Sequence, residues 1–307
     1  MSNLLFSKGG VSDSGGMRGG QISHALTGQY ETLILNQQNI HSKNKIVILV
    51  KDMFDNIEVL THLKNNGNKI IFDVIDLISI DIYDTDKNYN IPNFLPELPI
   101  EYFDGYIVNN TKMKKWWVEN VDSDESKPIF VIPHHWDMRF RWFPKGYYDK
   151  QPYFYFLGYE GHTGKNGLHL NRLQEEGFLQ DWRKGGPPGV CKMFLDRPVN
   201  GCQLSVRDKN SWEYCMKPAT KLATSSAMDS VIITTNDWSV QDLLPSEYPY
   251  ILENSGYDDV VNMIRKVEDT FEGDEWFLAK EILNQVKNDT SLDVIIEKYK
   301  DIDKYFK

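Results

Sequence analysis

The sequence has few cysteines, no long apolar run and no excess of positive charge. Its three cysteines, Cys191, Cys202 and Cys215, form no CxxC pair among 307 residues. An odd number of thiols without that spacing favours neither a disulfide framework nor a structural zinc site, and it is typical of a reducing, cytoplasmic compartment. The formal net charge of −10 disfavours a nucleic-acid-binding surface, because such surfaces need many cations to neutralise phosphates.

No apolar stretch approaches the roughly twenty residues needed to cross a bilayer, and the N-terminus does not resemble a signal peptide. Hydrophobic residues make up 41% of the chain and charged residues 25%, which is the profile of a folded globular protein. The length is sufficient for two domains, each with its own core. We therefore expect a two-domain cytoplasmic protein without a transmembrane segment.

Apolar, β-branched runs alternate with helical patterns along the chain. Strands are expected over residues 3–6, 30–36, 45–50, 69–76, 100–109, 128–133, 153–158, 203–206, 231–235 and 248–252. Helices are expected over residues 21–26, 59–64, 111–118, 168–182, 218–227, 258–271, 276–286 and 294–299. Such alternation predicts doubly wound parallel sheets, whose ligands bind outside the carboxyl ends of the strands.

A lysine-rich helix start follows the strand expected over residues 203–206. Pro218 suits the first turn of a helix, and alanines recur every four positions beyond it, so that one face can pack closely on a sheet. Backbone N–H groups and the helix dipole attract anions at such a start, and Arg207, Lys217 and Lys221 add positive charge. The pattern suits a diphosphate site, although lysines at this spacing also suit a solvated helix face.

Glycine is concentrated near the N-terminus, where six glycines lie between Gly9 and Gly20. A backbone with so few side chains can turn sharply and approach a ligand closely. The segment lacks the G-x-G-x-x-G fingerprint followed by an acid, which disfavours an NAD-dependent enzyme. A ligand-contacting loop and a flexible surface loop are both compatible with it.

The order Val206-Arg207, then Lys-Pro-Ala-Thr-Lys-Leu, then a small-residue helix and an apolar strand resembles the donor-binding half of GT-B glycosyltransferases, in particular bacterial and viral sugar transferases with this segment. The resemblance implies an α/β fold of two Rossmann-like domains facing a central cleft. We expect an acceptor domain over residues 1–140, a donor domain over 141–275, and closing helices over 276–307 that can cross back to the first domain.

The resemblance further implies transfer of a sugar from a nucleotide-diphosphate sugar to a hydroxyl of a glycan, without a cofactor or a required divalent metal. The residues expected to contact the donor are Arg207, Lys217, Lys221, Thr220, Thr163, Lys165 and Asp242. Those expected at the acceptor side of the cleft are Gly15, Gly16, Arg18, His134 and His135.

An inverting enzyme needs a general base for the acceptor proton, whereas a retaining enzyme needs none. Asp13 is the first candidate for this base, followed by His24 and Asp73. The sequence leaves two other functions open. Asp84-Thr85-Asp86 has the Asp-x-Asp spelling of a metal-dependent GT-A transferase, and the chain could also be a sugar- or nucleotide-binding module without turnover.

Overall fold

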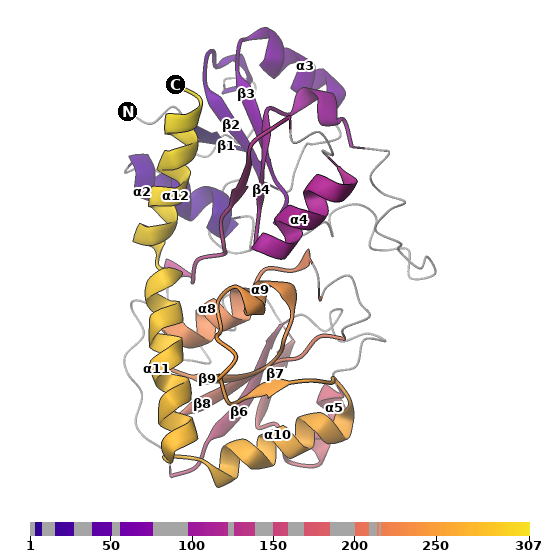
Figure 1. Cartoon of the computed structure of the whole chain (residues 1–307), viewed down its shortest axis with the longest axis vertical. Coiled ribbons are helices and arrows are strands. Elements are labelled where there is room, and N and C mark those ends of the chain that lie inside the picture. The colour runs from indigo at the N-terminus through magenta and orange to yellow at the C-terminus, as the bar shows by residue number, and fades with distance from the viewer. Residues whose placement is uncertain are drawn as a thin grey trace. The chain divides into compact units, whose positions relative to one another are not determined.

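The computed structural model describes residues 4–7, 16–27, 39–50, 56–75, 98–121, 126–138, 150–158, 169–184, 200–208, 214 and 216–307. The chain forms two compact units, each built on one parallel sheet (Figure 1). Unit 1 comprises Met1–His135, Met216–Pro218 and Leu292–Lys307, and unit 2 comprises Trp136–Cys215 and Ala219–Ser291. The predicted α/β class with two parallel sheets is confirmed.

The sheet of unit 1 has five strands in the order β1-β2-β3-β4-β5, each parallel to its neighbour. They are β1 (Leu4–Phe6), β2 (Ile46–Val50), β3 (Lys69–Asp73), β4 (Gly105–Val108) and β5 (Ile129–Val131). All residues of β2 and β4 are buried, as expected for parallel strands covered on both faces.

Helices pack around this sheet. They are the π-helical turn η1 (Met17–Gln21), α2 (Ile22–Thr27), the 3₁₀ turn η2 (Asn39–His41), α3 (Ile57–Asn65), the 3₁₀ turn η6 (Ile100–Tyr102), α4 (Thr111–Asn120) and α12 (Leu292–Tyr305). Helix α4 begins where the Asn110 side chain accepts a hydrogen bond from the Met113 N–H at 2.7 Å. The C-terminal helix α12 lies against α2 (Figure 1).

The sheet of unit 2 has the order β10-β9-β8-β6-β7, and its strands are also parallel. They are β6 (Tyr153–Gly158), β7 (Asp181–Lys184), β8 (Gly201–Ser205), β9 (Val231–Thr235) and β10 (Ile251–Leu252). The chain adds β7 on one side of β6 and then β8 on the other. The strand order therefore reverses between β6 and β8, which is the topological switch point of a doubly wound sheet.

The helices of unit 2 are α5 (Leu170–Glu175), α8 (Thr220–Ala227), α9 (Trp238–Gln241), α10 (Tyr257–Asp269) and α11 (Asp274–Asp289). Helix α11 packs along α8 and β9 (Figure 1). The core joins apolar residues from β8, β9, α10 and α11, among them Leu204, Ile232, Ile264 and Leu283. Among the described residues, no helix combines the length and the apolar character needed to cross a membrane.

Several predicted elements have different bounds in the structure, and two of them contain a second kind of element. The helix expected over 168–182 ends at Glu175, because Gly177 takes a φ of +82° that terminates it, and Asp181–Lys184 instead forms strand β7. The strand expected over 100–109 is confined to β4, since Ile100–Tyr102 forms a 3₁₀ turn. The strand expected over 30–36 lies outside the described residues.

Candidate functional site

The carboxyl ends of β6 and β8 flank the switch point of the second sheet. In doubly wound folds, the crevice outside such a point is where ligands bind. Arg207 follows β8 by two residues, and the Nζ atom of Lys221 on α8 lies 4.8 Å from the ring centroid of Phe156 on β6. Both of these predicted donor-site cations follow β8 in the chain, and Lys221 faces a ring of β6, the strand on the other side of the switch point.

Arg207 is held in place by a buried ion pair. Its Nη1 donates to Oδ2 of Asp237 at 2.9 Å, and its backbone N–H donates to Oγ1 of Thr235 at 3.1 Å. Asp237 also caps α9, because its Oδ1 accepts the Val240 N–H at 3.0 Å. Burial raises the pKa of Asp237, although Arg207 and the cap hydrogen bonds act in the opposite direction. The guanidinium of Arg207 is thereby fixed close to the end of β8.

Helix α8 starts at Thr220, and its N-cap residue Ala219 offers no side-chain acceptor to the first N–H groups. Oγ of Ser225 donates to Oε1 of Gln203, which ties the buried face of α8 to β8. Ala223 is fully buried on this face, as the alanine spacing predicts. The start of α8 is consequently a set of backbone donors beside Lys221, the arrangement that suits an anion.

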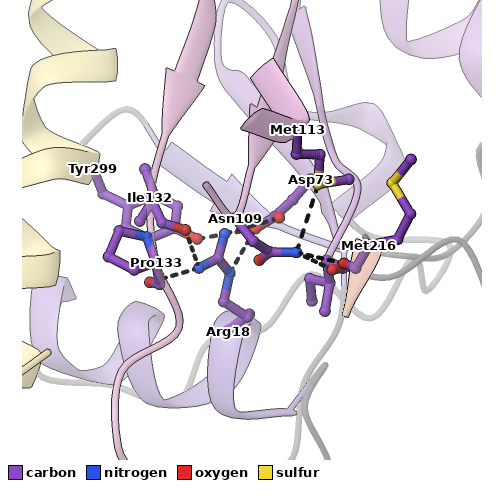
Figure 2. A network of polar contacts seen from close by, with 9 residues as sticks. Arg18, Asp73, Asn109, Met113, Ile132, Pro133, Met216 and Tyr299 are labelled. Atoms are coloured by element: carbon purple, nitrogen blue, oxygen red, sulfur yellow. Dashed lines mark hydrogen bonds and ion pairs between the residues drawn. The ribbon is translucent and has the colours of Figure 1, made fainter. Parts of the chain in front are cut away.

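The other predicted donor-side residues are not grouped with Arg207 and Lys221 in the described structure. Lys217 belongs to the short segment Met216–Pro218, which is part of unit 1, and the Met216 carbonyl accepts from Nδ2 of Asn109 at 3.4 Å (Figure 2). Asp242 is exposed and follows α9 directly. Thr163 and Lys165 lie outside the described residues.

In unit 1, Arg18 and Asp73 form an ion pair that is fully buried. The Nε and Nη2 atoms of Arg18 donate to the two carboxylate oxygens of Asp73, each at 3.0 Å (Figure 2). Nη1 of Arg18 donates to the carbonyls of Ile132 at 2.8 Å and Pro133 at 3.0 Å. The Tyr299 hydroxyl donates to Oδ2 of Asp73 at 3.0 Å. Burial opposes the charge on Arg18, but Asp73 and Tyr299 outweigh it and raise the Arg18 pKa.

His134 and His135 follow β5 and are both buried, with stacked rings whose centroids lie 5.4 Å apart. Nε2 of His135 is 3.2 Å from Oε1 of Gln21, so this nitrogen carries the proton, while Nδ1 of His135 has no hydrogen-bond partner among the described residues. Burial, together with the charges of His134 and Arg18, lowers the pKa of His135 well below its usual value. The His135 imidazole is therefore neutral at neutral pH.

The remaining candidate residues of the N-terminal half do not join the Arg18 and Asp73 ion pair. Gly16 precedes η1 as its N-cap residue, and His24 is half-buried on α2. Asp13 and Gly15 lie outside the described residues, as do Asp84 and Asp86 of the Asp-x-Asp triplet. Sequence reasoning did not identify Tyr299 as a partner of Asp73, because the two are 226 positions apart and no local pattern joins them.

No protein-family model matches the sequence, and no curated protein sequence is detectably similar to it. Solved structures of glycosyltransferases are similar in fold. HepE of Anabaena, solved with UDP, superposes with a TM-score of 0.56 over 87% of this chain and 79% of its own, at 8% identity. Sucrose-phosphate synthase from Thermosynechococcus elongatus gives a TM-score of 0.54 over 85% of this chain and 73% of its own, at 8% identity.

A chain of the GtfA/B complex gives a TM-score of 0.51 at 13% identity, and the match covers 86% of this chain but only 58% of that one. These structures are GT-B glycosyltransferases. The chain has a GT-B fold. In this GT-B fold, the Arg207 and Lys221 pair lies in the second sheet unit and the Arg18 and Asp73 pair in the first. The GT-B fold also differs from the one that the GT-A alternative requires.

Proposed function

We propose that the chain is a glycosyltransferase that moves a sugar from a nucleotide-diphosphate sugar to a hydroxyl of a glycan acceptor. The observation that carries this proposal is the placement of Arg207 and Lys221 beside the β6–β8 switch point of a GT-B fold. HepE, which has the same fold at low identity, was solved with UDP and with UDP-glucose. A nucleoside diphosphate is the ligand whose charge these cations match.

Sugar transfer breaks the bond between the anomeric carbon and the diphosphate oxygen, so the leaving group gains negative charge. Donors that are already oriented toward this charge stabilise the transition state more than the ground state. Asp237 orients Arg207, and the Lys221 ammonium lies over the Phe156 ring, 4.8 Å from its centroid, beside the first turn of α8. Lys217, Thr220, Thr163, Lys165 and Asp242 are proposed as further donor contacts.

On the acceptor side, an enzyme that inverts the anomeric carbon must pass the hydroxyl proton to a base as the hydroxyl oxygen bonds to that carbon. Asp73 is unsuited to this step, because both of its oxygens accept from Arg18 and one also accepts from Tyr299 in a site closed to solvent. We therefore propose Asp13 as the base, with His24 as the alternative. Asp73 is proposed to hold Arg18 in place instead. Gly15, Gly16 and the histidine pair are proposed to shape the acceptor side.

The test is the affinity for UDP and other nucleoside diphosphates, followed by transfer from the matching nucleotide-sugars. Lys221→Met keeps the apolar stem but removes the charge, and we expect roughly ten- to hundredfold weaker nucleotide binding, because a hydrogen bond to a charged group contributes about 1.5–3 kcal/mol. Lys114→Met, on the exposed face of α4, is the matched control and is expected to bind like wild type.

Unchanged nucleotide affinity in both Lys221→Met and Arg207→Lys, with folding verified, contradicts the proposed diphosphate site. A wild-type chain that binds nucleotide-sugars but releases no nucleoside diphosphate in the presence of glycans is a binding module instead of an enzyme. Calorimetric titration measures the first result, and a nucleotide-release assay measures the second.

A further inference from the structure

Unit 2 has a small polar cavity between the end of α8 and one face of α11, two helices that pack side by side (Figure 1). Its wall includes Ser226, Asp229 and Ser230 at the end of α8, and Lys280 and Lys287 on α11. The cavity encloses about 20 Å³, which is room for one water-sized group, and it opens to solvent.

Lys280 is held in this cavity by Asp229. Its Nζ lies 3.0 Å from Oδ1 of Asp229 and also donates to the Asp229 carbonyl. Asp229 follows α8 with a φ of +58°, a conformation in which glycine is the usual residue. Only 21% of the Lys280 side chain is exposed, so the ammonium is largely removed from water at a fixed position.

The cavity contains more positive than negative charge. Lys287 lines it too, and the Lys287 ammonium makes no ion pair or hydrogen bond with the described residues. Two ammonium groups are therefore present beside the single carboxylate of Asp229. Burial lowers the pKa of Lys280, Asp229 raises it, and the charge of Lys287 lowers it further. An anion placed between the two lysines would offset their repulsion.

The donors available to such an anion lie along one face of α11. Lys280, Asn284 and Lys287 are spaced i, i+4 and i+7, and all three line the cavity. Asn284 is exposed, and its side chain has no hydrogen-bond partner among the residues that the structure describes. Two ammonium groups and one amide suit a group that carries several oxygens, and lysine is a common ligand of phosphate.

We propose that this cavity binds a small oxyanion, either free phosphate or the phosphoryl group of a phosphomonoester. Because the cavity has room for one water-sized group, one oxygen enters beside Lys280, and the others are bound by Lys287 and Asn284 at the opening. The site lies at the end of α8, whereas Lys221 lies in the first turn of this helix. It is therefore separate from the proposed diphosphate contacts and independent of sugar transfer.

Asn284→Asp tests the proposal, because it places a carboxylate between the two lysines without changing the side-chain volume. Each variant is made in a Lys221→Met chain, which removes a donor-side cation. Replacing chloride by phosphate at equal ionic strength should raise the Tm of the parent chain by about 2–4 °C once phosphate exceeds its Kd about tenfold. Asn284→Asp should lose this increase while keeping the parent Tm in chloride, since the new carboxylate pairs with lysines on its own helix.

Lys287→Met should lose the phosphate-dependent increase in Tm as well. Lys300→Met removes an exposed lysine of α12 and is the matched control, so it should keep the increase shown by the parent chain. An equal increase in the parent chain, Asn284→Asp and Lys287→Met overturns the proposal, because phosphate then acts elsewhere on the protein.

A second measurement reports on the cavity directly. Acetic anhydride labels lysines, and mass spectrometry should show labelling of Lys287 slowed about tenfold at phosphate concentrations near ten times the Kd, with Lys300 unaffected. Glucose 6-phosphate and glucose are compared with phosphate. Protection by phosphate alone identifies the free ion as the ligand, and protection by both phosphate and glucose 6-phosphate identifies the phosphoryl group. Protection by neither, or equal protection by glucose, overturns the proposal.

Discussion

Arg207 and Asp237 form an ion pair in which Nη1 and Oδ2 lie 2.9 Å apart, with 8% and 0% of their side chains exposed. The carboxylate serves two elements at once, because its other oxygen caps α9. Burial works against both charges, so the pair depends on its two members being present together. One residue of the proposed donor site is therefore also part of what holds unit 2 together.

We expect Asp237→Ala to lower the free energy of unfolding by about 3–5 kcal/mol, since it leaves the Arg207 charge buried without this partner. Asp237→Asn should lose less, because an Asn side chain can still cap α9. The double variant Arg207→Met, Asp237→Ala should be more stable than Asp237→Ala alone. Urea unfolding measures the free energy of unfolding of all three variants. A double variant less stable than Asp237→Ala would show that the buried charge of Arg207 is not the cause of the lost stability.

His135 should make the stability of unit 1 depend on pH. Its pKa in the folded state lies well below the value of about 6.5 expected in the unfolded chain. Below pH 6.5 the unfolded chain takes up a proton that folded His135 does not, so the free energy of unfolding falls by up to about 1.4 kcal/mol per pH unit until the folded pKa is reached. Above about pH 7 this contribution is constant.

His135→Asn removes this titration, and its stability should fall less than that of wild type between about pH 7.5 and 5.5. His169→Asn, at an exposed position, serves as the control, and its free energy of unfolding should change with pH as that of wild type does. Urea midpoints at the two pH values provide the measurement. Equal slopes in wild type and His135→Asn would rule out His135 as the buried neutral group.

Gly201 starts β8 where there is no room for a side chain. A Cβ atom there would lie 2.7 Å from Oγ of Ser230 and 2.7 Å from Cε1 of Tyr155. We expect Gly201→Ala to destabilise unit 2 by about 1–3 kcal/mol through overpacking. Gly177→Asn is the control, because no atom of the described residues lies within 4 Å of a Cβ at that position, and Asn tolerates its φ of +82°. Thermal unfolding that ranks the two variants equally would contradict the close contact at Gly201.

Asn110 links the end of β4 to the start of α4. Because its side chain accepts the Met113 N–H at 2.7 Å in a fully buried position, Asn110→Ala should cost about 1–2 kcal/mol. Asn110→Ser, which retains an acceptor for this N–H, should recover much of that loss. Helicity and urea midpoints give the comparison, and equal stability of the two variants would show that the cap contributes little.

Local patterns were sufficient to predict most of the helices and strands. The strand at 231–235 and the helix that begins after Pro218 were predicted from β-branched runs, proline and alanine spacing, and the structure has them as β9 and α8. Strand β7 was not predicted, because Asp181–Lys184 is polar at three of four positions and its place beside β6 is decided by pairing across the sheet.

The sequence by itself determined the alternating α/β architecture and the cationic start of α8, because both depend on residues that are neighbours along the chain. Only the tertiary structure decided that Arg18 and Asp73, 55 positions apart, would neutralise each other in a closed site. The same is true of Tyr299, which reaches Asp73 from the C-terminal helix. Such pairings follow from which strand ends and helices the fold brings together, and that information is held by no single stretch of sequence.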